Sequence, residues 1–137
     1  MGGHRAIVIT IDTNVLVRAV AEDDVQQAAA AQELLRGLTE ETPGFVNLTV
    51  IVELHWVLTR TLRLPTGLVH QILDRLMAST TLEIEDGESV GEALEQARRG
   101  ADFADALIDA TSRLYGINET VTFDRDAAKR FGWRLLA

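Results

Sequence analysis

Short apolar runs alternate with longer helical patterns along this chain. Two β-branched runs, 6–11 and 120–123, have the length and composition of buried strands, and each leads directly into an aspartate. Further strands are predicted at 45–47, 81–85 and 133–136, and helices at 15–20, 24–38, 49–62, 68–76, 88–99, 103–115 and 127–131. Strands separated by helices predict an α/β fold, a three-layer α/β/α sandwich with a central, mainly parallel sheet.

A single domain spanning 6–137 fits the composition. The chain has 137 residues, of which 47% are hydrophobic, and no apolar run approaches the roughly 20 residues of a membrane helix. Residues 1–5 show no pattern and are expected to be a native extension or a remnant of cloning. The chain has no cysteine, which excludes disulfides and thiolate metal sites, and no secretory signal, so a cytoplasmic location is expected.

The net charge of −8 argues against a broadly basic surface for nucleic acid. The basic residues are nevertheless clustered. Arg98 and Arg99 precede the helix 103–115, and Arg125 opens a basic stretch after Asp124. Solvated surfaces and salt bridges are the ordinary use of such residues, and contact with phosphate oxygens is the functional alternative.

Four acidic residues are candidates for one site. Asp12 and Asp124 follow the two apolar strands, and the carboxyl ends of parallel strands meet at one edge of a sheet. Glu53 lies in an apolar helix and Asp105 near the start of a later one. If these acids meet, their repulsion is tolerable only with divalent metal or protons between them. Because no histidine pair has metal-ligand spacing, oxygen ligands favour Mg²⁺ or Mn²⁺ over Zn²⁺.

Each candidate also has an ordinary structural explanation. Asp12 can cap the following helix, although Asn14 can be that cap and leave Asp12 free. Glu53 can lie on an outward polar stripe, but its apolar neighbours predict a shielded carboxylate that needs a partner. Asp124 can close a turn, with Thr122 and Asp126 supporting or replacing it.

The helix 103–115 carries three aspartates on one face. Asp102 and Asp105 lie in its first turn, where the helix dipole favours negative charge and Asp102 can act as the cap. Asp109 has neither explanation and is treated as a possible neighbour of the site.

Together these motifs resemble a known family. Ile11-Asp12-Thr13-Asn14, the Glu53 helix, Asp102-Phe103-Ala104-Asp105 and Val121-Thr122-Phe123-Asp124 occur in the order and spacing of PIN-domain proteins, and specifically of VapC-type toxins. The resemblance covers residue 7 to the C-terminus. It implies an α/β/α sandwich, Mg²⁺- or Mn²⁺-dependent cleavage of RNA, a homodimer, and inhibition by a cognate VapB-type antitoxin.

The resemblance also implies roles for individual residues. The catalytic acids would be Asp12, Glu53, Asp105 and Asp124, with Asp12, Asp105 and Asp124 as metal ligands. The supporting residues would be Asn14, Thr122, Asp102 and Asp126, and RNA phosphates would be held by Arg98, Arg99 and Arg125.

Two other interpretations remain open at this level. A phosphatase of the haloacid-dehalogenase type also has an aspartate after its first strand, but it needs a second one where this chain has Asn14, and Lys129 comes late for its lysine. A catalytically silent binding module would use an apolar groove for a partner helix, formed from Val20, Leu34, Leu35, Leu38, Trp56 and Leu62.

Overall fold

The computed structural model describes residues 9–21 and 23–137. The chain divides into two compact units, one ending at Glu85 and the other running from Asp86 to Ala137. The expected extension 1–5 and positions 6–8 of the first predicted strand lie outside the described residues.

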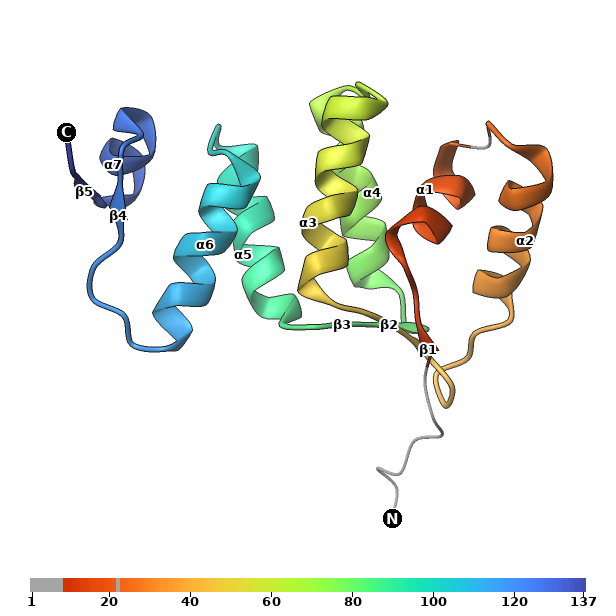
Figure 1. Ribbon diagram of the computed structural model, residues 1–137. Helices are drawn as coiled ribbons and strands as arrows, with labels where there is room; N and C mark the ends of the chain where they lie inside the picture. The colour runs from red at the N-terminus through yellow and green to blue at the C-terminus, as the bar shows by residue number, and fades with distance from the viewer. Residues whose placement is uncertain (1–8, 22) are drawn as a thin grey trace, which may run out of the picture. The chain divides into compact units, whose positions relative to one another are not determined.

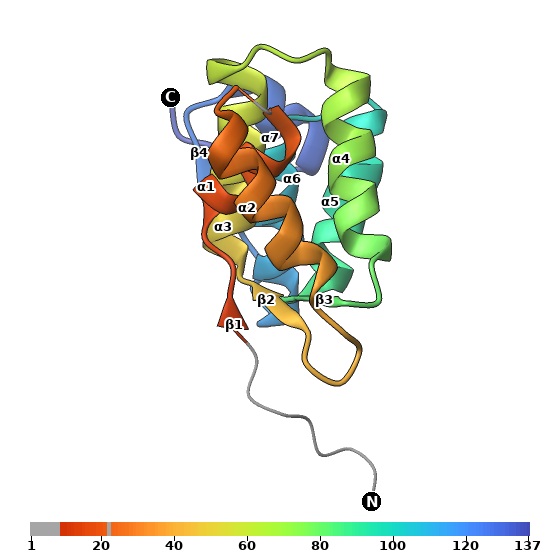
Figure 2. The same cartoon turned by 90° about the vertical axis from the view of Figure 1, so that its right-hand side faces the viewer.

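The first unit alternates strands and helices (Figures 1 and 2). Its three strands pair in parallel in the order β1-β2-β3, with β2 in the centre. α1 packs against α2 and α3, and α4 packs against β3. In chain order the elements are β1 (Ile9–Thr10), α1 (Thr13–Ala21), α2 (Val25–Arg36), β2 (Gly44–Val46), α3 (Leu48–Trp56), the π-helix η1 (Val57–Thr61), α4 (Thr66–Ala78) and β3 (Leu82–Ile84).

The parallel register places the carboxyl ends of these strands at one edge of the sheet. Ile9 lies opposite Gly44, and Gly44 opposite Leu82. Asp12 therefore leaves the sheet at the same edge as Asn47, which follows β2. Asn47 caps α3 by accepting a hydrogen bond from the Val50 N–H at 2.9 Å.

Close packing around the central strand favours a glycine at position 44. A Cβ atom there would lie 2.9 Å from Leu38 Cδ1 and 3.0 Å from Ile11 Cγ1. The side chains around it form the core of this unit, whose fully buried members include Ile11, Leu16, Val46, Ile51, Leu54, Leu58, Val69 and Leu73.

The helix predicted at 49–62 changes its hydrogen-bonding pattern after Trp56. α3 ends there and the chain continues as η1, where the Leu62 N–H donates to the Val57 carbonyl five positions earlier. The Thr59 hydroxyl donates to the carbonyls of His55 at 2.7 Å and Trp56 at 3.2 Å. A threonine hydroxyl that bonds back to the preceding turn competes with the regular helical ladder, which accounts for a π-turn here.

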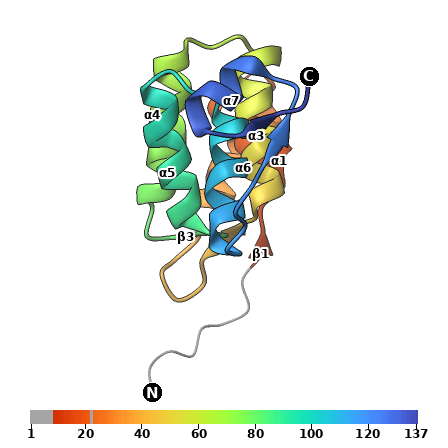
Figure 3. The same cartoon turned by 90° about the vertical axis from the view of Figure 1, so that its left-hand side faces the viewer.

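The second unit consists of two packed helices and a small βαβ element (Figure 3). α5 (Gly87–Arg98) and α6 (Phe103–Leu114) pack along each other, with Val90, Leu94, Phe103, Ala106 and Ala110 buried. β4 (Val121–Thr122) and β5 (Arg134–Leu135) pair in parallel and are connected by α7 (Arg125–Phe131).

The strand predicted as buried at 120–123 is shorter and more exposed than expected. β4 has two residues, Val121 is 47% exposed and Phe123 is 72% exposed. A strand with one partner and two residues cannot enclose its apolar side chains within this unit. The prediction of burial at this strand was therefore wrong, although its position and its following aspartate agree with the sequence pattern.

Candidate active site

In the first unit, Thr13 links two of the predicted acids. Its backbone N–H donates to Asp12 Oδ1 at 2.8 Å, and its hydroxyl donates to Glu53 Oε1 at 2.7 Å. Thr13 is buried, with 8% of its surface exposed, so its two donors are fixed by the packing around α1. Thr13, which follows β1, and Glu53, in the middle of α3, are forty positions apart in the sequence. Thr13 therefore holds the carboxylates of Asp12 and Glu53 close to each other.

One expectation about these residues was wrong, and one open alternative is not the one observed. Glu53 is exposed rather than shielded, because Val50, Ile51 and Leu54 form the buried face of α3 and Glu53 lies on its other side. Asn14 lies inside α1 rather than before it, so it is not the helix cap. The partner that Glu53 was expected to need is nevertheless present in the Thr13 hydroxyl.

A surface hollow adjoins this pair, and we call it the α1–α3 hollow. Apolar side chains are its largest group, together with two acids, two uncharged polar residues and one arginine. Its lining comprises Asp12, Thr13, Asn14, Val17, Arg18, Val52, Glu53, Trp56 and Val57.

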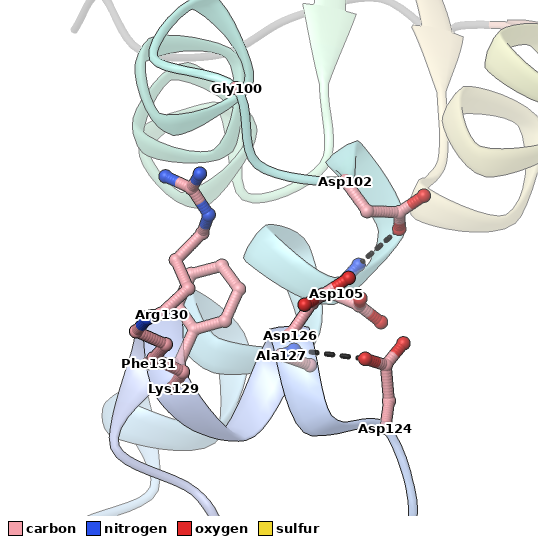
Figure 4. Close-up of a pocket in the computed structure, with 9 residues that line it drawn as sticks. All are labelled: Gly100, Asp102, Asp105, Asp124, Asp126, Ala127, Lys129, Arg130 and Phe131. Atoms are coloured by element: carbon pink, nitrogen blue, oxygen red, sulfur yellow. Dashed lines mark hydrogen bonds between the residues drawn. The ribbon is translucent and has the colours of Figure 1, made fainter.

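In the second unit, a second hollow, the α6–α7 hollow, brings the other predicted acids together. Figure 4 shows the carboxylates of Asp102, Asp105 and Asp124 converging on it. Asp102 caps α6 by accepting from the Asp105 N–H at 2.9 Å. Asp124 caps α7 by accepting from the Ala127 N–H at 3.0 Å, and Thr122 accepts from the Asp124 N–H at 3.0 Å. Each capping bond occupies one carboxylate oxygen, so Asp102 and Asp124 can cap their helices and present the other oxygen to the hollow.

The surroundings of Asp105 disfavour its negative charge. Its pKa is raised above the usual aspartate range, first by partial burial and then by repulsion from Asp102 and Asp124. A cation held between these carboxylates would relieve that repulsion.

The donor chemistry fits a hard divalent cation, although the geometry does not form a complete ligand set. Carboxylate oxygens are the usual protein ligands of Mg²⁺ and Mn²⁺. Across residues 9–21 and 23–137, however, no three His, Asp or Glu side chains are arranged to hold a metal ion. Asp12 and Glu53 form one close group, and Asp102, Asp105, Asp124 and Asp126 line the other hollow.

The basic residues next to the acids differ from the predicted ones. Arg98 and Arg99 form ion pairs with Glu95, at 3.4 and 3.5 Å. Lys129 and Arg130 line the α6–α7 hollow, within the part of the chain that the structure describes, and the predicted Arg98, Arg99 and Arg125 do not. Asp126, Lys129 and Arg130 are spaced i, i+3 and i+4 on α7, a signal that was available in the sequence.

Asp109 has a structural role instead of a place beside the acids. Its Oδ1 accepts from the Trp133 indole N–H at 3.0 Å, and its Oδ2 accepts from Arg113 Nε at 3.2 Å. Arg113 also pairs with Glu92 at 3.0 Å. Asp109 thus ties the C-terminal strand region to α6, and it is not among the residues that line the α6–α7 hollow.

The family comparison decides how these groups are interpreted. The family model of the PIN domain matches residues 9–133. The chain belongs to the PIN domain family. PIN domains are typically metal-dependent nucleases with an α/β fold, which agrees with the predicted fold class and with the carboxylates at the two hollows. The match leaves the haloacid-dehalogenase interpretation without support.

One further comparison and one further feature of the helices bear on this chain. A search of curated proteins gave no match for this PIN domain. In the described part of the chain, no helix has the length and apolar character needed to span a membrane.

Proposed function

We propose that this PIN domain is an endoribonuclease that hydrolyses RNA phosphodiester bonds with Mg²⁺ or Mn²⁺. The observation that carries the proposal is the pairing of all four family acids within their own units. Thr13 joins Asp12 and Glu53, and Asp105 is in electrostatic contact with Asp124. Carboxylates held close together are the kind of oxygen ligands that a metal-dependent hydrolase uses.

By the family resemblance, the metal would have Asp12 as its ligand in the first unit, and Asp105 and Asp124, which line one hollow, as its ligands in the second. When bound, it supplies positive charge that stabilises the negative charge developing on the phosphate group. Glu53 is the group that accepts a proton from the attacking water, because its Oε1 is held by Thr13 and its other oxygen remains for that task. The leaving oxygen takes a proton from solvent as the bond to phosphorus breaks.

Binding of the RNA backbone is assigned to Lys129 and Arg130. Both lie in the last turn of α7 and line the hollow that contains Asp105 and Asp124. Ammonium and guanidinium groups bind phosphate oxygens with charge-assisted hydrogen bonds. Local cations of this kind allow a chain with a net charge of −8 to bind RNA.

The proposal extends to the biological setting. The order and spacing of the acidic motifs support a VapC-type toxin that acts in the cytoplasm as a homodimer and is inhibited by a cognate VapB-type antitoxin. Expression of the chain alone would then arrest growth, and Asp12→Asn would abolish the arrest.

Incubation with total RNA tests the reaction itself. Purified protein with Mg²⁺ or Mn²⁺ is expected to produce discrete new RNA ends, and chelation with EDTA is expected to prevent them. Asp12→Asn and Asp105→Asn serve as controls whose folding is checked by circular dichroism. Cleavage that persists in EDTA or in both variants would overturn the proposal, as would hydrolysis of a small phosphomonoester without any cleavage of RNA.

A further inference from the structure

Trp56 is an exposed tryptophan at the edge of the α1–α3 hollow. It is the last residue of α3, it is 58% exposed, and it lines the same hollow as Asp12 and Glu53. Glu53 and Trp56 are three positions apart, so they lie on the same face of the helix. The indole ring is therefore a neighbour of the acids that we assign to catalysis.

The core of this unit does not use the indole ring. Ile51, Leu54 and Leu58 form the buried side of this helical segment. Trp56 instead remains accessible beside Val52, which is 39% exposed. The backbone at Trp56 is held in place, since its carbonyl accepts a hydrogen bond from the Thr59 hydroxyl in η1. π-turns of this kind occur often at functional sites.

The charges around the hollow indicate what kind of contact it offers to RNA. Asp12 and Glu53 repel phosphate groups, and the cation in the lining, Arg18, is already engaged by Asp23 at 3.2 Å and by Gln27 at 2.6 Å. Apart from a metal ion bound at Asp12, an attractive contact in this hollow therefore comes largely from an uncharged group. The exposed indole is suited to this, because every nucleobase has a face that stacks on an aromatic ring.

We propose that Trp56 stacks on an unpaired base next to the scissile phosphate, so that the substrate is single-stranded at that nucleotide. This inference rests on the proposed ribonuclease function. The α1–α3 hollow has a volume of about 690 Å³, which lies within the range of roughly 300–1,000 Å³ typical of small-ligand sites and is large enough for a nucleotide.

A docked partner helix fits the same surface less well. Helix-in-groove recognition uses a long apolar stripe with anchors at several successive turns. On α3 the exposed apolar residues facing the hollow are Val52 and Trp56, four positions apart, and acidic Asp12 and Glu53 adjoin them. One exposed ring beside two carboxylates matches a single base better than a helix.

A binding experiment without catalysis isolates the stacking contact. A short fluorescein-labelled single-stranded RNA is titrated with full-length protein in EDTA, followed by fluorescence anisotropy. Trp56→Ala is expected to weaken binding roughly 5- to 150-fold, the range found for loss of one stacked base, whereas Trp56→Phe retains most of the affinity. Tyr115→Ala is the matched control, because it removes another exposed ring, one that is 83% accessible and lies on the other unit.

A scan with abasic nucleotides identifies the stacked base. Each abasic substitution is measured with the wild-type protein and with Trp56→Ala. At one position the loss seen with the wild type is expected to disappear in Trp56→Ala, because both changes remove the same contact. Equal losses at every position in both proteins, or full affinity of Trp56→Ala, would overturn the stacking proposal.

The cleavage assay keeps this inference separate from the function on which it rests. If the wild type cleaves RNA but Trp56→Ala cleaves single-stranded RNA equally well, the stacking role is wrong and the ribonuclease function stands. If the wild type binds through Trp56 but cleaves no RNA with Mg²⁺ or Mn²⁺, the ribonuclease function is wrong and the base-stacking contact stands.

Discussion

Replacing Thr13 with valine removes the hydroxyl that holds Glu53 and leaves a side chain of nearly the same shape. The bond lost is the 2.7 Å contact to Glu53 Oε1, while the backbone N–H that Thr13 donates to Asp12 remains. The substitution therefore separates the support of Glu53 from the support of Asp12.

The expected loss of stability is small. Hydrogen bonds to charged groups contribute about 1.5–3 kcal/mol, but Glu53 is exposed and regains water when the bond is lost. A net decrease of about 0.5–1.5 kcal/mol in the free energy of unfolding follows, equivalent to roughly 2–6 °C in Tm. Chemical denaturation at neutral pH measures it.

The expected loss of activity is larger than the loss of stability. Removing a residue that orients a catalytic carboxylate typically costs about 10- to 100-fold in rate. We expect Thr13→Val to lower kcat for RNA cleavage by that amount with little change in KM, and Thr13→Ser to restore most of the activity.

The double variant with Glu53→Ala provides the decisive control. If Thr13 acts through Glu53, adding Thr13→Val to Glu53→Ala costs little further activity. A full additional loss in that background, or a Thr13→Val enzyme as active as the wild type, would refute the reasoning.

Three further predictions concern charge and capping. Because the pKa of Asp105 is raised, its ionised form destabilises the fold, and solvent screens this partly exposed group, so metal-free Asp105→Asn should be more stable than the wild type at pH 7 by only about 0.2–0.5 kcal/mol. That advantage should fade as pH falls through the raised pKa toward the ordinary aspartate range, and urea titrations showing no gain at pH 7 would contradict it. Asp109→Ala and Trp133→Phe should couple by about 1 kcal/mol in a denaturation cycle, without loss of RNA cleavage, and additive effects would contradict their bond. Asp24→Ala, which removes the cap on the Gln27 N–H, should cost about 1 kcal/mol in thermal unfolding, and an unchanged Tm would exclude this contribution.

Local patterns allowed much of this structure to be predicted from the sequence. The cap at Asp102, the helix after it and the helix predicted at 24–38, which forms as α2, depend on residues within one or two turns. Each of these features is encoded where it occurs, so residue spacing is sufficient to find it.

Contacts between distant positions could not be predicted in the same way. Thr13 was not identified because its partner, Glu53, is forty positions away and a buried threonine after a strand has no distinctive pattern. The shielding expected for Glu53 was wrong because a large share of apolar residues in a helix does not say which of its faces is buried. Trp56, Lys129 and Arg130 could have been predicted, because each lies three or four positions from an acid on the same helix.

Asp102 and Asp124 each cap a helix and also line the α6–α7 hollow, and these two roles affect how related chains should be interpreted. Both carboxylates cap helices, so selection for a stable fold would preserve them even in a descendant that had lost all enzymatic activity. Glu53 and Asp105 cap no helix, and the charge of Asp105 works against folding. The Thr13 hydroxyl gives Glu53 a stabilising contact, so genetic drift should erase Asp105 first, which makes this position the better marker for separating working enzymes from inactive descendants.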